Sequence, residues 1–433
     1  MNNIKKSKHL NASELLKETR RCFTNIGEEK SGTISLTDHL MSGIAIFSLK
    51  YPSLLQFEKD RREKTIESNL KNLYGIERIP SDTYLRECLD EVEPHLLHPA
   101  YKALFQKIQR VKVLTKFVYL DGYYLCILDG TTYFSSKKIH CEQCGERHHD
   151  NGTTTYYHQM LGAVLANPDL KEVIPLAPEP IIKQDGIEKN DCERNAAKRL
   201  LERIHSDHPR LKLIIVEDSL ASNAPHIRHL RSLNFKFILG AKQSDHKFLF
   251  DYVERSQTTV KYEFMDENGV HHQFRYLNDA PLNESNSDLK INFLEYWETS
   301  PKGKQKHFSW VTDILIDEFN IMKLMRGGRS NWKIENETFN TLKNQGYNFE
   351  HNFGHGYKNL STVFMHLMMI AFLVDQIQQL GCTFFKMALQ SVETKNRLWR
   401  KMRVYFDCFL IPSWEALYEA IICRISSVIY DTS

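Results

Sequence analysis

Three acidic residues lie where their carboxylates could together hold divalent metal ions. Asp129 ends the apolar run YYLCIL, Asp218 ends the apolar run LKLIIVE, and Glu335 lies on the predicted helix RSNWKIENETFNTLKNQ. Carboxylates that are close together and away from water are costly unless a cation neutralises them. Because no cysteine or histidine accompanies these acids, their oxygen atoms favour magnesium or manganese. We expect two such ions, which would clamp the attacking and leaving oxygens of a phosphoryl transfer.

Each of these acids also has a purely structural alternative. An aspartate at the end of a strand often forms a turn or caps the next helix, and a glutamate on a helix is usually solvated. The order of the elements that carry the acids is what favours a shared site.

The element order of residues 119–244 brings two of the acids together. Three strand-like runs come first, and the prolines of the third place it at a sheet edge. A helix, the buried strand LKLIIVED, a second helix and the strand FKFILGAK follow. This is the order of an α/β ribonuclease-H-like core, in which the first and fourth strands of a mixed five-stranded sheet are neighbours. We therefore expect Asp129 and Asp218 to lie side by side.

The chain as a whole is predicted to contain four regions. A helix-turn-helix-like DNA-binding unit, with Arg61, Arg62 and Lys64 between its helices, is one interpretation of the first region, and a helical packing domain is the other. The regions are a helical N-terminal domain (1–118), the catalytic core (119–244 and 321–360), a β-rich insertion (245–320) and a helical C-terminal region (361–433).

A second cluster of residues with metal-binding side chains follows the first predicted strand. The segment KIHCEQCGERHHDNGTTTYYHQ contains a Cys-x-x-Cys pair and several histidines, the ligand types of a structural zinc site. The alternative is a polar hairpin between the first two strands. Either would lie near the edge that carries the acids, where it could contact DNA. The candidate zinc ligands are Cys141, Cys144, His148 and His158.

The segments LDGTTYF, VEDSLASN and WKIENETFNTLK, which carry the three acids in order, resemble the acidic motifs of DDE transposases from bacterial insertion sequences. The resemblance covers roughly residues 120–360 and is to the branch with a β-strand insertion before the final glutamate. It implies that Asp129, Asp218 and Glu335 form the catalytic, magnesium-binding triad of an enzyme that cleaves DNA and transfers strands. It also implies terminal inverted repeats and target DNA as partners, and a homodimer on DNA.

This sequence departs from the last motif of that family at three positions, where a tyrosine, an arginine and a lysine are replaced by Gly328, Asn331 and Leu342. Basic residues nearby are expected to contact DNA phosphates in their place, and these are Arg329, Lys333 and Lys343. Members of this branch commonly free the element through a DNA hairpin, and an aromatic residue of the insertion helps to hold a flipped base. Trp297 and Trp310 are the candidates by region, and packing in the core is the alternative for both.

Two glutamates of the final predicted helix compete for the catalytic role. On an α-helical wheel Glu335 falls on the same face as Trp332, Phe339 and Leu342, whereas Glu337 points about 200° away. We therefore expect Glu335 to lie within the buried stripe and Glu337 to face solvent.

The bulk properties are compatible with a DNA-binding enzyme and do not require one. The chain has 433 residues, 42% of them hydrophobic, and a formal net charge of +3. The longest apolar run, 363–374, is interrupted by a histidine and is too short for a membrane span, so no membrane partner is expected. The basic start of the chain lacks an apolar signal core, and the nine cysteines are expected to be reduced in the cytoplasm.

Two rival functions remain open on the sequence alone. A structure-selective nuclease on the same fold would hydrolyse DNA without strand transfer. A DNA-binding protein derived from a transposase would lack catalytic activity altogether.

Overall fold

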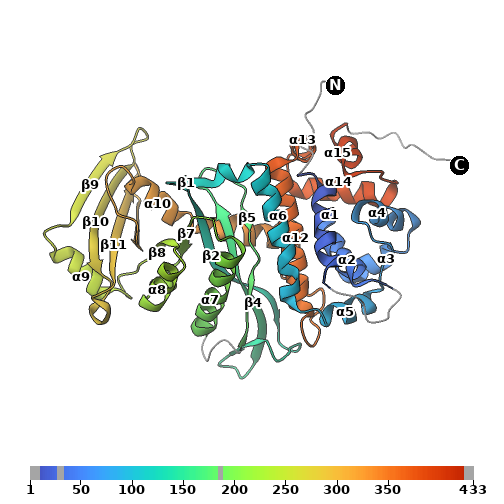
Figure 1. Ribbon diagram of the computed structural model, residues 1–433, viewed down its shortest axis with the longest axis horizontal. Coiled ribbons are helices and arrows are strands. Elements are labelled where there is room, and N and C mark those ends of the chain that lie inside the picture. The colour runs from blue at the N-terminus through green and yellow to red at the C-terminus, as the bar shows by residue number, and fades with distance from the viewer. Residues whose placement is uncertain (1–9, 27–33, 184–188, 424–433) are drawn as a thin grey trace.

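The structure places a helical unit beside one large mixed β-sheet (Figure 1). It is a computed structural model that describes residues 10–26, 34–183 and 189–423. Figure 1 shows helices from both ends of the chain gathered on the right, and the sheet running from the middle of the molecule to its left end. The predicted α/β class is confirmed.

The strands of the sheet come from two parts of the chain. The part before the insertion contributes β1 (Val118–Leu120), β2 (Tyr123–Ser136), β3 (Gly145–His148), β4 (Thr154–Ala166), β5 (Ile174–Pro175), β6 (Glu179–Ile181), β7 (Leu213–Glu217) and β8 (Lys236–Gly240). The insertion contributes β9 (Val260–Met265), β10 (His271–Pro281), β11 (Lys290–Thr299) and β12 (Gln305–Thr312). The main path through the sheet is β3-β4-β2-β7-β8-β12-β11-β10-β9, while β1 pairs with β2, and β5 and β6 pair with β4.

The pairing of β2 with β7 joins the two strands that carry the candidate aspartates. β2 runs antiparallel to β4 and parallel to β7, and β7 runs parallel to β8. Every residue of β7 is buried, as expected for a parallel strand that is covered on both faces. In this register Ile127 lies opposite Val216. The predicted adjacency of the two strands is therefore confirmed.

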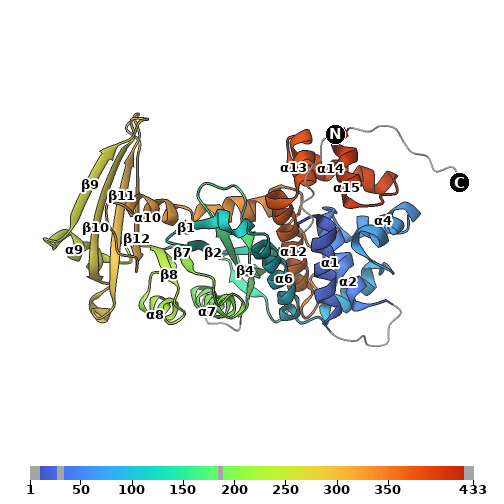
Figure 2. The ribbon, with the colours of Figure 1, turned by 45° about the horizontal axis from the view of Figure 1, so that its top comes forward.

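Three helices cover this part of the sheet. Figure 2 shows the first two on one side of the sheet and the third on the other. The first packs on β4 and β6, the second on β8, and the third on β7 and β8. They are α7 (Lys189–Asp207), α8 (Ala224–Ser232) and α10 (Ile321–Arg329).

The insertion extends the same sheet. It begins with α9 (Lys247–Arg255), a helix where a β-rich segment was expected, and β9 to β12 then form at the four predicted places. The last of these strands returns to the core: β12 pairs antiparallel with β8, with Trp310 opposite Gly240. The insertion is therefore joined to the core by backbone hydrogen bonds as well as by its connecting segments.

The helices of the two ends of the chain pack against one another. A single buried helix lies at their centre and contacts helices from both ends. This helix, Leu360–Gly381, is long and apolar enough to cross a membrane by length and composition, but its apolar window is fully buried inside the protein. The helices are α1 (Ala12–Thr24), α2 (Leu36–Ser48), α3 (Leu54–Asp60), α4 (Lys64–Tyr74), α5 (Asp82–Asp90), α6 (His98–Arg110), α12 (Leu360–Gly381), α13 (Thr383–Val392), α14 (Lys395–Cys408) and α15 (Trp414–Cys423).

The chain turns between α3 and α4 at residues 61–63. The Glu58 side chain holds this turn by accepting hydrogen bonds from Arg61 and Arg62. These two arginines, which the sequence offered as DNA contacts, are thus ion-paired within the unit. Ser81 caps α5, its hydroxyl accepting from the N–H of Tyr84.

Asp90, at the end of α5, holds the start of α12. Its carboxylate accepts hydrogen bonds of 2.9–3.0 Å from four consecutive backbone N–H groups, those of residues 357–360. Burial alone would raise the pKa of Asp90, but these four donors lower it below its ordinary value of 3.8. The ionised carboxylate therefore stabilises the fold above that pH, and the contribution is lost as the pH falls through the lowered pKa.

We predict that Asp90→Asn lowers the free energy of unfolding at pH 7 by about 1–3 kcal/mol, because charge-assisted hydrogen bonds are lost. The deficit should shrink as the pH falls below 3.8, since the wild-type carboxylate then becomes protonated. Chemical denaturation across this pH range measures both effects. Glu91→Gln is the matched control, because the neighbouring Glu91 makes only an exposed pair with Lys358. Equal stability of wild type and Asp90→Asn at pH 7 would contradict the prediction.

Candidate functional site

Asp129, in the middle of β2, lies beside the carboxyl end of β7, which Asp218 follows. Two residues beyond the parallel pair of Ile127 with Val216, the register brings Asp129 beside Asp218. Each side chain also makes a local bond: Asp129 accepts from the N–H of Gly130 at 2.8 Å, and Asp218 accepts from the N–H of Leu220 at 2.9 Å. The structural role of a strand-end aspartate therefore applies to Asp218, which caps the turn after β7, whereas Asp129 lies inside β2 opposite Gly162 of β4.

The backbone around Asp218 is packed closely against the next strand. A Cβ atom added to Gly240 of β8 would lie 3.0 Å from the backbone nitrogen of Ser219 and 3.2 Å from the carbonyl carbon of Asp218. Only glycine fits there without a shift. Gly240 also pairs with Trp310, so it lies between Asp218 and the insertion.

Glu335 reaches the same region from a π-helical turn, η6 (Ile334–Phe339), that packs on β2 and β4. Ile334 and Phe339 fix this turn, because a Cβ atom on Gly162 of β4 would meet their side chains at 3.5 and 3.1 Å. Such wide turns are rare and often occur at functional sites. The Glu335 carboxylate lies close enough to Asp129 to raise its pKa.

The expected burial of Glu335 is wrong. Glu335 is exposed and so is Trp332, half of whose surface is accessible, whereas Ile334, Phe339 and Leu342 are buried. The π-helical turn changes the angle between successive residues, so the α-helical wheel no longer assigns the faces. Glu337, expected in solvent, is partly buried and interacts electrostatically with Lys333 and Lys395.

The electrostatics of Asp129 favour a bound cation. The pKa of Asp129 is raised to about 6, mainly by burial and in part by the carboxylates of Asp218, Glu193 and Glu335, while the hydrogen bond from Gly130 opposes the rise. In the described part of the chain these acids are not among the side chains already gathered closely enough to hold a metal ion. An ion would therefore have to draw their side chains inward.

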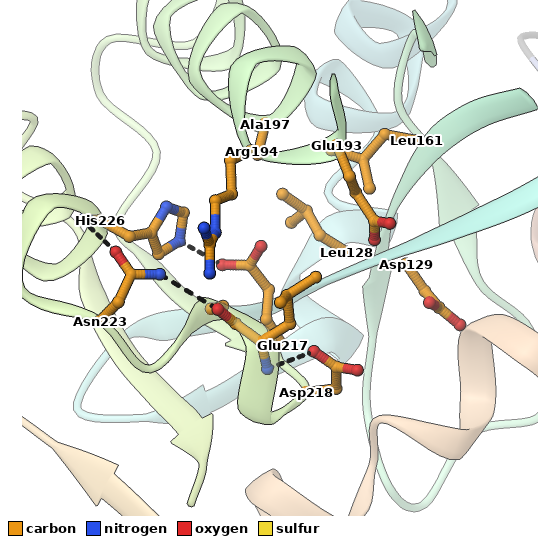
Figure 3. Close-up of a pocket in the computed structure, with 12 residues that line it drawn as sticks. Leu128, Asp129, Leu161, Glu193, Arg194, Ala197, Glu217, Asp218, Asn223 and His226 are labelled. Carbon is orange, nitrogen blue, oxygen red and sulfur yellow. Dashed lines mark hydrogen bonds and ion pairs between the residues drawn. The ribbon is translucent and has the colours of Figure 1, made fainter. Parts of the chain in front are cut away.

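The pocket beside these acids contains residues that were not predicted as site residues. Figure 3 shows Glu193 and Arg194 of α7 reaching into it, and His226 of α8 meeting Glu217. Glu193 lies on the same helix face as the buried Ala197 and Leu200. A carboxylate on a buried helix face is the sequence signal that could have identified Glu193 as a site residue.

Glu217, the neighbour of Asp218 in the sequence, is paired with a histidine. His226 Nε2 lies 2.6 Å from its carboxylate. Burial favours neutral His226, but the Glu217 carboxylate raises the pKa overall, and both side chains are buried. Glu217 is thus neutralised by an ion pair, which leaves Asp218 as the acid that faces Asp129.

An open groove of about 830 Å³ leads away from Asp218 between β8, β12 and α10. Its lining includes the exposed ring of Trp332 and three basic side chains, which are Lys242, Lys306 and Arg329. Basic and aromatic side chains along a groove fit a nucleic-acid strand.

Of the three basic residues that were expected to contact DNA, one lines this groove and two do not. Arg329 lines it, pairs with Glu298 and lies 5.0 Å over the ring of Phe308. Lys333 is only 3% exposed and donates to the carbonyl oxygen of Leu170, so it is not available to a phosphate. Lys343 is partly buried and pairs with Glu350 at 3.2 Å, outside the groove.

The two tryptophans of the insertion differ in exposure. Trp310 is 5% exposed and packs so closely on Gly328 that a Cβ there would lie 2.5 Å from its ring. This tryptophan packs in the core, the alternative considered from the sequence, and Gly328 allows that packing. Trp297 is partly buried and stacks on His307 with 5.0 Å between ring centroids.

The cysteines and histidines form a separate metal-binding cluster, which could hold an ion such as zinc. We call these four residues the Cys/His cluster: Cys141, Cys144, His158 and His355. Their four ligand atoms lie within 4.8 Å of one another. The prediction of His148 as a ligand is wrong: His148 is exposed and bonds to the Thr154 hydroxyl at 3.0 Å. No local spacing pointed to His355, which reaches the cluster through the fold.

We predict that Asp129→Asn raises the thermal stability of the metal-free protein at pH 8, because a neutral side chain avoids burying charge among carboxylates. The pKa of Asp129 is raised above 3.8, so its ionisation costs stability as the pH rises from there through about 6. The advantage of Asp129→Asn should therefore disappear at pH 4. Asp150→Asn, at an exposed site, is the control. A variant less stable than wild type at pH 8 without metal would refute the assignment.

Neither a family model nor a curated protein matches the chain. Among solved structures, the cryo-EM structure of a piggyBac transposase synaptic complex with hairpin DNA is similar to this chain, at 9% sequence identity and a TM-score of 0.39. The alignment covers 98% of this chain and 82% of that chain. A likeness of this degree carries no argument about activity.

Proposed function

We propose that this chain is a DDE transposase that cleaves the ends of a mobile DNA element and joins them to target DNA. The observation that carries the proposal is the convergence of Asp129, Asp218 and Glu335 from three separate elements at the carboxyl end of β7. The strand order around them supports a ribonuclease-H-like core within the larger sheet. The resemblance of the three acidic segments to that family supports the same assignment.

The acids would act as metal ligands in this reaction. Asp129 and Asp218 would bind from neighbouring strands and Glu335 from the π-helical turn, and their oxygen atoms suit magnesium or manganese. Two such ions, when bound, would activate water or a 3′-hydroxyl and neutralise charge on the phosphate. The ion pair of Glu217 with His226 keeps a fourth acid out of this set.

The groove between β8, β12 and α10 is the proposed DNA-binding site. It begins at Asp218, and its basic side chains would contact phosphates and position the strand without reading its sequence. Two element ends must be handled together, so we propose that a homodimer acts on terminal inverted repeats. The proposed place of action is the cytoplasm, at the nucleoid.

We predict that Glu335→Gln abolishes cleavage, because an amide is a poor ligand for magnesium, and that the variant remains folded since the residue is exposed. Glu337→Gln, two residues away on the same turn, is the matched control and should cleave at nearly the wild-type rate. The assay supplies magnesium, a labelled duplex from the DNA beside the coding sequence, and a target plasmid.

The products of this assay separate the candidate functions. Labelled ends joined to the plasmid identify a transposase, whereas cleaved ends without joined products identify a nuclease. Binding without any cleavage would identify a DNA-binding protein. An active Glu335→Gln with an inactive Glu337→Gln would overturn the proposed site.

The groove generates a separate prediction about affinity. Lys242→Gln should weaken binding of all duplex sequences similarly, and should reduce the slope of log affinity against log salt by about 1. Lys59→Gln, at an exposed position on α3, should change neither. Titrations at several salt concentrations measure both, and an unchanged slope for Lys242→Gln would place the DNA elsewhere.

A further inference from the structure

Four potential metal ligands from three separate segments converge on one point. Cys141 and Cys144 precede β3, His158 lies on β4, and His355 lies in the loop before α12. The two sulfur atoms are 3.9 Å apart, and the two Nε2 atoms are 3.1 Å apart. The Cys144 sulfur lies 3.4 Å from both Nε2 atoms, and the Cys141 sulfur lies 3.5 Å from Nε2 of His158.

These separations match the edges of a tetrahedral zinc site. Zinc binds sulfur at about 2.3 Å and imidazole nitrogen at about 2.0–2.1 Å, so tetrahedral ligands lie roughly 3.8 Å (S to S), 3.5 Å (S to N) and 3.3 Å (N to N) apart. Each of these five distances is within about 0.2 Å of its expected value, and the sixth edge, from the Cys141 sulfur to Nε2 of His355, is no longer than 4.8 Å. The sulfur atoms are far beyond the bonding distance of a disulfide, about 2.05 Å.

A hydrogen bond outside the cluster orients the His355 ring for metal binding. Its Nδ1 lies 2.8 Å from the carbonyl oxygen of Gly356, which can only accept, so Nδ1 carries the proton and Nε2 presents its lone pair to the cluster. The rings of Tyr133 and Phe134 pack against the two histidines, with centroids 5.8 Å and 4.5 Å away. Three of the four ligands are buried, which excludes water.

We propose that the Cys/His cluster binds one zinc ion with a closed set of four protein ligands, and that this ion has a structural role. Two thiolates and two imidazoles leave no position for a substrate, as in structural rather than catalytic zinc sites. Magnesium would not compete, because it prefers oxygen ligands.

The proposed ion would connect the sheet to the helical unit. Cys144 and His355 are 211 residues apart in the sequence, so the ion would close a long loop. The loop that carries His355 is already held on its other side by Asp90, which binds residues 357–360. Zinc would therefore fix this loop to β4 and to the segment before β3, and Asp90 fixes the same loop to α5.

The full-length protein, purified without chelator, should contain about one zinc ion per chain by elemental analysis. Removal with a chelator should lower the unfolding temperature, and added zinc should restore it. Cobalt(II) added to the zinc-free protein should give the intense visible bands of a tetrahedral thiolate site. A well-folded protein that contains no zinc, takes up none on dialysis and binds no cobalt would overturn the proposal.

Variants identify the ligands independently of activity. His355→Ala and Cys144→Ser should each lose zinc, whereas His148→Ala and Cys408→Ser, at exposed positions outside the cluster, should retain it. If Cys144→Ser fails to fold, the zinc content of the soluble His355→Ala variant decides. Full zinc content in His355→Ala would refute the four-ligand site. Loss of zinc in His148→Ala would identify His148 as a ligand and would also overturn it.

Discussion

The parallel pairing of β2 with β7 is the constraint on which the site depends. These strands are far apart in the sequence, and the first half of β2 meets β7 because α7 carries the chain back across the sheet. The register of this pair sets the positions of Asp129 and Asp218, and a shift by one residue would turn the side chains to the other face. The four apolar residues of β7, Leu213 to Val216, are buried, and their burial opposes such a shift.

The strand pattern of this chain was predictable because burial leaves a strong signal in composition. A continuous apolar run marks β7, and alternating or aromatic runs between polar turns mark β9 to β12. The adjacency of the aspartate-bearing strands followed from the order of the elements. Each of these inferences needed only local pattern and a general rule of topology.

The errors concern features that local pattern does not encode. The exposure of Glu335 and Trp332 depends on a π-helical turn, which an α-helical wheel cannot represent. His355 joins Cys144 across 211 residues, and no spacing rule covers such a distance. Lys333 was expected to contact DNA phosphates, and lysines are rarely buried, but its ammonium group donates to the carbonyl oxygen of Leu170.

The hydrogen bonds between β12 and β8 have a mechanical consequence. A β-rich insertion joined only by two flexible linkers could swing freely, whereas this one is a rigid extension of the core sheet. Gly240 pairs with Trp310 on one side and touches the backbone of Asp218 on the other. A displacement of the outer strands would therefore move β8 and, through the close packing at Gly240, the backbone of Asp218.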